Sequence, residues 1–288
     1  MKFLVSGSTG FVGTKVVAFL KSQGHEVVGV SGYKPSQKRL TIPMVGRGAE
    51  LQPAALDFGP DVIVHAATYF VGQHQSSDIA RLVDANIACG MELLEIAQAT
   101  DAKFLTLSSS WQHFDGATYS PVNLYAATKQ GFDDIVTFYE DSGVHVDRLT
   151  LFDTFGPGDR RGKIVSLLLQ AAKSGEALAV GAKTNLIDLT YVDDVARAIC
   201  AVAADDSNRG PIDAVIRSGP VPLVELVETI IRAIECPVPV VWEAREARPR
   251  EMQTDWIFGQ PLDGWHPEIS LSEGIKRTWA DSWNAKRE

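Results

Sequence analysis

The sequence predicts an α/β protein built on a doubly wound parallel sheet, with a smaller C-terminal lobe. Three observations predict this fold. Short runs of apolar and β-branched residues recur through the first half of the chain, segments with helical spacing of apolar residues separate them, and a glycine-rich turn joins the first run to the first such segment. Because parallel strands need long crossover connections, this alternation indicates a parallel sheet with helices on both faces.

The elements follow from these patterns in chain order. The predicted strands have buried, β-branched character and lie at residues 2–6, 27–30, 62–66, 104–107 and 144–151. The predicted helices have apolar residues three and four positions apart and lie at residues 14–23, 79–99 and 124–141.

Glycine and proline become more frequent after Gly156, and the strict alternation fades. We therefore expect a main domain over residues 1–155 and a lobe made mainly of residues 156–288. Residues 187–202 again read as a strand that runs into a helix. We expect about seven mostly parallel strands in the main sheet, completed by a strand near residue 189, so that residues 186–205 return to the main domain.

Composition excludes several classes of function. The 27 basic and 36 acidic residues give a net charge of −9, which argues against a nucleic-acid partner. No apolar run is long enough to cross a membrane, and the first residues show no signal-peptide layout, so we expect a cytoplasmic protein. Three widely spaced cysteines suit neither a disulfide framework nor a metal site, and we expect thiols in the core.

The turn at residues 7–13, Gly-Ser-Thr-Gly-Phe-Val-Gly, is the clearest motif of the chain. Its position between a strand and a helix is typical of a Rossmann-type dinucleotide site, where backbone N–H groups and the helix N-terminus bind a pyrophosphate. The residues expected to contact the cofactor here are Gly7, Thr9, Gly10, Phe11, Val12 and Gly13.

The end of the second strand bears on the choice of dinucleotide. An acidic residue at this point would bind the ribose of NAD, but the sequence has Ser31, Gly32 and Lys34. A serine and nearby basic residues suit the 2′-phosphate of NADP. NADP is therefore favoured and NAD stays possible; the alternative is that these basic side chains only solvate a surface loop.

Tyr125 and Lys129 stand four residues apart at the start of a predicted helix, and therefore on one face. An ammonium near a phenol lowers the phenol's pKa and allows proton exchange near neutral pH. Ser108, Ser109 and Ser110 follow a predicted strand at the sheet edge where such folds bind ligands. A hydroxyl there can hold a carbonyl oxygen beside Tyr125, although serines at strand ends often only form turns.

These motifs together resemble the extended short-chain dehydrogenase/reductase family, which contains nucleotide-sugar epimerases, dehydratases and reductases. The resemblance rests on GSTGFVG at 7–13, HAA at 65–67, SSS at 108–110, YAATK at 125–129, FGPGD at 155–159 and YVDDVARAI at 191–199. Within the family, SSWQHFD, PVNLYAATKQ and LFDTFGPGDRRGKIV are similar to the CDP-4-keto-6-deoxyglucose reductases of the abequose and paratose synthase group.

The resemblance implies a role for each matching residue. Tyr125 is the proton donor, Ser110 positions the substrate's oxygen, and Lys129 holds the nicotinamide ribose and tunes Tyr125. It also implies cofactor contacts from Ala66, Ala67 and Ser108, an active-site neighbour in Asn86, and no metal. Substrate contacts are expected from Gln112, His113, Thr154, Lys163 and Arg248.

Two departures from the family pattern narrow the function. Trp111 and Gln112 stand where dehydratases of the family have an acidic pair, which disfavours dehydration. Ile187 replaces an arginine that commonly contacts the substrate phosphates, so Arg248 and Lys163 become the expected anion partners.

The leading expectation is an NADPH-dependent reductase of a nucleotide-linked 4-keto-6-deoxysugar, with a CDP-sugar favoured. An NAD-dependent nucleotide-sugar epimerase is the alternative enzyme, and a non-catalytic NADP-binding redox sensor is the alternative of another class. The family also implies a homodimer in which helices 79–99 and 124–141 form a four-helix bundle.

Overall fold

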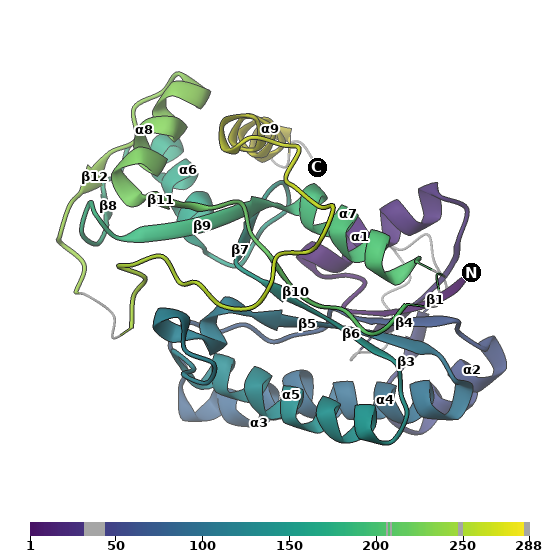
Figure 1. Ribbon diagram of the computed structural model, residues 1–288. Coiled ribbons are helices and arrows are strands. Elements are labelled where there is room, and N and C mark those ends of the chain that lie inside the picture. Colours follow the sequence, from purple (N-terminus) through teal and green to yellow (C-terminus); the bar gives the residue numbers. More distant parts are fainter. Residues whose placement is uncertain (32–43, 206, 208, 247–249, 285–288) are drawn as a thin grey trace.

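A sheet of seven strands, all parallel, forms the centre of the molecule (Figure 1). The computed structural model describes residues 1–31, 44–205, 207, 209–246 and 250–284. The strands lie in the order β10 (Asp213–Ile216), β6 (Val146–Leu151), β5 (Lys103–Ser109), β4 (Val62–His65), β1 (Lys2–Ser6), β2 (Glu26–Ser31) and β3 (Met44–Gly46). Every neighbouring pair is parallel, which confirms the predicted fold class.

Helices cover both faces of this sheet. Helices α1 (Phe11–Ser22) and α7 (Val192–Ala203) pack side by side on one face, above the sheet in Figure 1. On the other face lie α2 (Leu51–Phe58), α4 (Cys89–Thr100) and α5 (Leu124–Asp141). Two apolar cores result, one between the sheet and each helical layer. The strands are buried on both sides because each layer covers one face.

The predicted helix at 79–99 is not one regular helix. It consists of α3 (Ile79–Val83), a π-helical turn over Asp84–Ala88, and α4. A π-helical turn inserts one extra residue into the helical repeat and is frequent at functional sites. Here it contains Asn86, whose side chain is fully buried.

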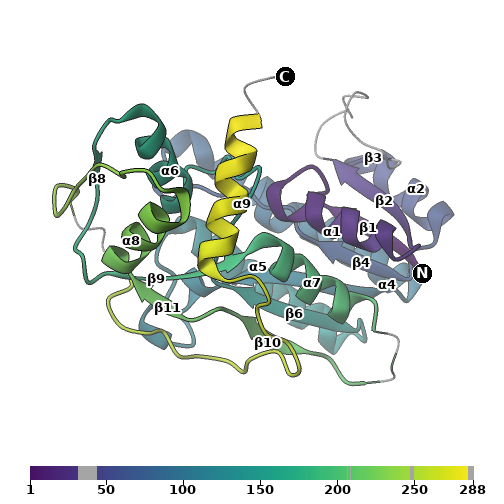
Figure 2. The ribbon, with the colours of Figure 1, turned by 90° about the horizontal axis from the view of Figure 1, so that it is seen from above.

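The smaller lobe has its own core. A three-stranded sheet of β11 (Pro220–Pro222), β9 (Leu186–Tyr191) and β7 (Asp153–Phe155) packs with α6 (Ile164–Ser174), α8 (Leu223–Ile234) and α9 (Leu271–Asn284). A short pair, β8 (Leu178–Ala179) and β12 (Val240–Val241), lies at the far end (Figures 1 and 2). Single 3₁₀ turns occur at Gly48–Glu50, Ser76–Asp78, Ser110–Gln112 and Phe114–Gly116.

The prediction that a strand near residue 189 completes the main sheet is wrong. That strand is β9, and both of its edges are taken by β7 and β11 of the small sheet. The main sheet is completed instead by β10, which pairs with β6. Helix α7, which follows β9, does return to the main sheet, because Val195, Ala198 and Ile199 belong to its core. The division of the chain at residue 155 stays a prediction.

Cys89 and Cys200 are buried thiols, as predicted, and Cys236 is partly exposed. Within the described residues, no helix is long and apolar enough to cross a membrane.

Candidate active site

The glycine-rich turn has the geometry of a cofactor cradle. Gly7 has φ +65°, and a Cβ there would lie 2.7 Å from the carbonyl of Ala66 and from the N atom of Ala67. A Cβ on Gly13 would lie 2.0 Å from the Gly7 carbonyl oxygen. These positions exclude side chains, and the first turn of α1 follows directly. The residues therefore fit a dinucleotide, whose pyrophosphate would be held by backbone N–H groups and by the positive end of α1.

A buried polar link fixes this turn to the neighbouring strand. The Ser6 hydroxyl lies 2.8 Å from His65 Nδ1, and the Ala67 N–H donates to Ser6 Oγ. Burial, reinforced by the nearby charge of Lys129, lowers the pKa of His65 to about 3, so its ring is neutral. The ends of β1 and β4 are thereby held together at the cradle.

Next to the cradle lies a cavity of about 310 Å³, called here the small cavity. It collects residues from the glycine turn, the end of β4, the end of β5 and the start of α5. Most of the predicted cofactor and catalytic residues line it: Gly7, Gly10, Phe11, Val12, Gly13, Ala66, Ala67, Ser108, Ser110, Tyr125 and Lys129.

Other predicted cofactor residues are not placed at this cavity. Thr9 is exposed and does not line it. Gly32 and Lys34 lie outside the described residues, as does the side chain of Ser31. The contacts to an adenosine 2′-phosphate stay a prediction.

Tyr125 lies in a partly buried, hydrogen-bonded environment. Burial raises the pKa of Tyr125, while hydrogen bonds with Thr68 and Ser109 and the charge of Arg161 act in the opposite direction. Withdrawal from water outweighs those effects, so the pKa of Tyr125 is raised and not lowered, and the action of Lys129 on the phenol stays a prediction. Tyr125 therefore carries its proton at neutral pH.

Lys129 lies one helical turn beyond Tyr125 and is buried, with 3% of its surface exposed. Burial lowers the pKa of the Lys129 ammonium, and the carboxylate of Asp133 partly restores it. That carboxylate also accepts hydrogen bonds from Ser108 Oγ at 2.9 Å and from Gln112 Nε2 at 2.6 Å. Asp133, which the sequence analysis did not single out, thus connects α5 to the end of β5.

Asn86 positions the loop that contacts Tyr125. Its Oδ1 accepts hydrogen bonds from the Tyr69 N–H at 2.7 Å and from Thr68 Oγ1 at 3.0 Å, and its Nδ2 donates to Thr128 Oγ1 at 2.9 Å. The π-helical turn places this amide between the loop and α5. The family resemblance indicated Asn86, whereas Thr68, which hydrogen-bonds Tyr125, was missed.

Two serines at the end of β5 have different contacts in the site. Ser109 hydrogen-bonds Tyr125 and also caps the following 3₁₀ turn through the Trp111 N–H. Ser110, the predicted catalytic serine, is buried and borders both cavities. The sequence could not separate these roles, because the chain leaves the extended conformation between Ser109 and Ser110.

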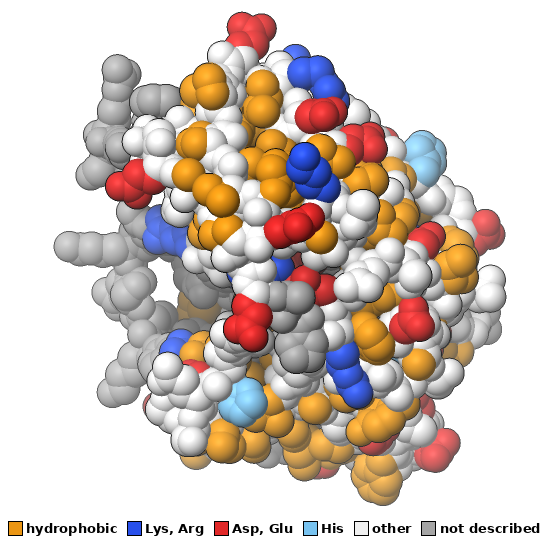
Figure 3. Space-filling model, turned by 90° about the vertical axis from the view of Figure 1, so that its left-hand side faces the viewer, with side chains coloured by type: hydrophobic (Ala, Val, Ile, Leu, Met, Phe, Trp, Pro, Cys, Tyr) orange, Lys and Arg blue, Asp and Glu red, His pale blue; other side chains and the backbone are white. Residues whose placement is uncertain are grey.

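A larger cavity of about 860 Å³, the large cavity, extends from this site into the smaller lobe. Eight residues border both cavities and form what we call the junction: Phe70, Ser110, Trp111, Phe152, Asp153, Thr154, Arg161 and Lys163. At the lobe's end of the molecule, Figure 3 shows a hollow with acidic and basic side chains at its margin. The predicted substrate residues Thr154 and Lys163 both lie at the junction.

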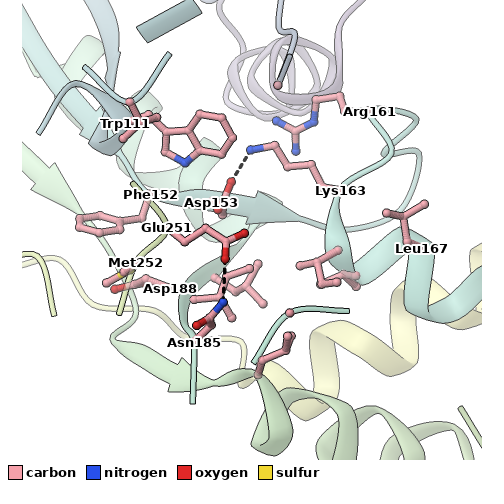
Figure 4. Close-up of a pocket in the computed structure, with 18 of the residues that line it drawn as sticks. Trp111, Phe152, Asp153, Arg161, Lys163, Leu167, Asn185, Asp188, Glu251 and Met252 are labelled. Carbon is pink, nitrogen blue, oxygen red and sulfur yellow. Dashed lines mark hydrogen bonds and ion pairs between the residues drawn. The ribbon is translucent and has the colours of Figure 1, made fainter. Parts of the chain in front are cut away.

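The cations of the large cavity are mostly paired with carboxylates. Arg161 binds Asp159 at 2.8 Å, Lys163 binds Asp153, and Arg245 binds Glu251. Figure 4 shows the Lys163 ammonium directed at Asp153, next to Trp111.

Arg250 differs from these cations. Among the described residues it pairs with no carboxylate, and it donates instead to the Pro121 carbonyl oxygen at 2.6 Å. Ile187 also borders the large cavity, so the position where the family has an arginine is apolar here.

Two of the predicted substrate residues, Gln112 and His113, do not line either cavity. Gln112 is fully buried, accepts from the Ser109 N–H and donates to Asp133, which gives it a structural role. His113 stacks on Phe258 with ring centroids 4.2 Å apart and faces the carbonyls of residues 117 and 118. Both stand in or next to the turn after β5, which bends them away from the junction. Arg248 lies outside the described residues.

Comparison with known proteins identifies the family of this chain. A profile of the NAD dependent epimerase/dehydratase family matches residues 3–216, which is most of the chain. The chain belongs to this family. Members of the family act on nucleotide-linked sugars with a nicotinamide dinucleotide, and the extended short-chain dehydrogenase/reductase resemblance is confirmed.

Relatives in the NAD dependent epimerase/dehydratase family have different names. A probable UDP-glucuronate 4-epimerase of Rhizobium meliloti (strain 1021) is 26% identical, covering 98% of this chain and 97% of its own. A CDP-abequose synthase of Salmonella muenchen is 23% identical and covers 96% of each chain. The structure of a UDP-glucuronic acid 4-epimerase from Bacillus cereus, in complex with UDP-glucuronic acid and NAD, superposes with a TM-score of 0.83 at 19% identity over 99% of this chain and 100% of that one.

Proposed function

We propose that this family member is an NADPH-dependent reductase of a nucleotide-linked 4-keto-6-deoxysugar, with a CDP-sugar favoured. The observation that carries this proposal is the aromatic packing at the junction, where Phe70 lies edge-on against Trp111 and Tyr125. Reduction of a carbonyl begins with a protonated donor, whereas oxidation of a hydroxyl begins with a phenolate base. Burial raises the pKa of Tyr125, which is compatible with a proton donor.

The proposed reaction uses residues of the small cavity and the junction. When bound at the glycine cradle, the reduced cofactor supplies the hydride. Tyr125 Oη donates its proton to the substrate's carbonyl oxygen, and Thr68 and Ser109 orient the phenol through their hydrogen bonds. The Lys129 ammonium would stabilise the negative charge that develops on the phenol as its proton leaves.

Ser110 is the proposed contact to the same substrate oxygen. Its hydroxyl makes no hydrogen bond with a described side chain or backbone group, and the residue borders both cavities. It can therefore donate to an oxygen held between them. Ser110 would stabilise the developing alkoxide, while Ser109 acts on the tyrosine.

The aromatic side chains at the junction favour binding of the sugar in one orientation, with one face of its ring toward the cofactor. Phe70 packs edge-on against both Trp111 and Tyr125, with ring centroids 5.4 and 5.1 Å apart. An epimerase returns hydride to the opposite face of its intermediate and needs room for the sugar to reorient. A packed aromatic wall beside Tyr125 favours a single orientation, and hence reduction.

The nucleotide would occupy the large cavity. Its diphosphate needs cationic partners, and Arg250 is the cation there that pairs with no described carboxylate. Arg250, together with Arg248, is the proposed diphosphate contact. The preference for NADP rests on the sequence after β2, where no acidic residue occurs between Val30 and Lys34.

The alternative is an NAD-dependent nucleotide-sugar epimerase, which the names of several relatives favour. Purified enzyme separates the two. A reductase is expected to be isolated without tightly bound cofactor and to consume one NADPH per 4-keto sugar, tested on a panel of CDP-, dTDP-, GDP- and UDP-linked sugars. Tightly bound NAD, with interconversion of two sugars and no net NADPH consumption, would establish the epimerase instead.

A further inference from the structure

The Asp153–Lys163 ion pair stands where the sugar must sit. Tyr125 lies at the small cavity, and the nucleotide needs the length of the large cavity, so the reacting sugar carbon lies at the junction between them. Asp153 begins β7, and Lys163 immediately precedes α6. The two side chains meet inside the junction although they come from different elements (Figure 4).

Aromatic rings flank this pair. The Lys163 Nζ lies 4.6 Å from the ring centroid of Phe70 and 5.2 Å from that of Trp111. The side chains of Asp153 and Lys163 are only 19% and 18% exposed. Charges in such surroundings are weakly screened by water, so their balance decides which further charge can enter.

The balance at the junction is close to neutral. Lys163 is matched by Asp153, and Arg161 is matched by Asp159, which it grips through two nitrogen atoms. No described cation at the junction is left without a carboxylate. A substrate carboxylate at this point would therefore be repelled by the carboxylates of Asp153 and Asp159. Both nearby cations, Lys163 and Arg161, are already paired.

We infer that Asp153, held by Lys163, is a specificity-determining residue that admits a neutral sugar and excludes a uronic acid. This rests on the proposed function, because it takes the sugar's reacting carbon C4 to lie at Tyr125. Carbon C6 is two bonds from C4, so the C6 group of a hexose also lies at the junction. A methyl or hydroxymethyl group is tolerated there, and a C6 carboxylate is repelled.

Asp153 also has a positive part in binding. Lys163 contacts its Oδ1, and its Oδ2 has no hydrogen-bond partner among the described residues. That oxygen can accept a hydrogen bond from a sugar hydroxyl. The same carboxylate thus distinguishes a hydroxyl donor from a second anion.

The test compares sugars that differ only at C6. Dissociation constants are measured by calorimetry for glucose and glucuronate, each as its UDP and its CDP derivative, so that the preference for a base cancels within each pair. Wild-type protein is expected to bind the glucose form at least tenfold more tightly. In Asp153→Asn the Lys163 ammonium becomes available, and the affinity for the glucuronate form is expected to rise at least tenfold relative to the glucose form.

Two further variants make the result specific. Lys163→Met leaves Asp153 uncompensated and is expected to weaken glucuronate binding further. Glu273→Gln removes a carboxylate from an exposed pair with Arg277 on α9, and is expected to leave the ratio unchanged. NADPH affinity reports that each variant is folded.

The outcomes separate this inference from the proposed function. The specificity role of Asp153 is overturned if the wild type binds the glucuronate form as tightly as the glucose form or more tightly. It is also overturned if Asp153→Asn changes the affinities for both sugars by the same factor. In either case nucleotide-sugar binding itself stands. Failure of all four nucleotide sugars to bind overturns both.

Discussion

Tyr125 is the residue on which the proposed chemistry depends most directly. Tyr125→Phe removes one hydroxyl and keeps the ring that packs against Phe70. We expect the reductive rate to fall by about 10²- to 10⁴-fold, the loss typical for a general acid, with NADPH affinity nearly unchanged. Single-turnover NADPH oxidation and fluorescence titration of the cofactor measure the two effects. Near-normal turnover by the variant would assign the proton to another group.

His65 predicts a pH dependence of stability. Its pKa is about 3 in the folded protein and near 6.5 in an unfolded chain, so between these values only the unfolded state binds the proton. Stability from this residue is therefore complete above pH 6.5 and decreases as the pH falls toward 3. Between pH 7 and 5 the free energy of unfolding should fall by about 2 kcal/mol through His65.

The measurement is chemical denaturation at both pH values, with His65→Asn as the comparison. The variant keeps a polar side chain near Ser6 but has no titrating ring. Its stability should depend less on pH over this interval. An identical pH dependence in both proteins would show that His65 titrates normally in the fold.

For single residues, the sequence predicted the proposed catalytic and cofactor-binding residues better than the side chains that hydrogen-bond or pair with them. Gly7, Tyr125 and Lys129 stand in short motifs with strong local requirements, and all three border the small cavity. Thr68, Asp133 and Asp153 act through contacts with residues ten or more positions away in the chain, and no spacing rule reveals such pairs. For the same reason Gln112 looked available for substrate, although two buried hydrogen bonds engage it.

Among the secondary-structure elements, the turn before α1 gives the sharpest prediction. In Gly13→Ala the new methyl group would collide with the Gly7 carbonyl, which is backbone and cannot move away cheaply. We expect a loss of about 1–3 kcal/mol in stability and a marked loss of cofactor affinity. Gly131→Ala in α5 is the matched control, because nothing lies within 4 Å of its added methyl.

The control variant should be neutral or more stable by up to about 1 kcal/mol, since alanine favours a helix over glycine. Thermal unfolding and NADPH titration compare the two proteins. Equal effects of both substitutions would contradict the close approach of Gly13 to Gly7.

A long pattern did not by itself give correct boundaries, since the predicted helix 79–99 is divided into α3, a π-helical turn and α4. Helix α5 has the predicted bounds, and β1 agrees residue for residue. The short strands β3 and β10 were missed, because three or four residues carry too little periodicity to be recognised. Strand β9 was recognised, but its neighbours were wrong, since a strand's own sequence does not specify the sheet that it joins.

At the scale of the whole molecule, the outer surface of the helical layer supports the predicted homodimer. Ile79, Val83, Met91 and Phe138 on α3, α4 and α5 are between 40% and 65% exposed. We expect the protein to be a dimer at micromolar concentration, and Phe138→Glu to make it monomeric, because a charge would be buried at the contact. Light scattering measures both masses.

Ile257→Glu is the matched control for this surface. Ile257 is 77% exposed and lies outside these helices, so its substitution should leave the mass unchanged. A wild-type monomer, or dissociation by both substitutions, would refute the proposed contact.

The position of β10 late in the sequence has a consequence for folding during synthesis. The main sheet takes six of its strands from the first 151 residues, and the seventh from residues 213–216, after the chain has passed through α6, β9 and α7. Until residues 192–216 have been synthesised, one edge of β6 has no partner strand and the sheet face that α7 covers is exposed to solvent. No N-terminal fragment that ends before residue 216 contains the whole main sheet. The smaller lobe cannot be deleted by truncation at one position without removing β10 from the main sheet. We therefore expect the cofactor-binding domain and the substrate lobe to be kept together in one chain during evolution.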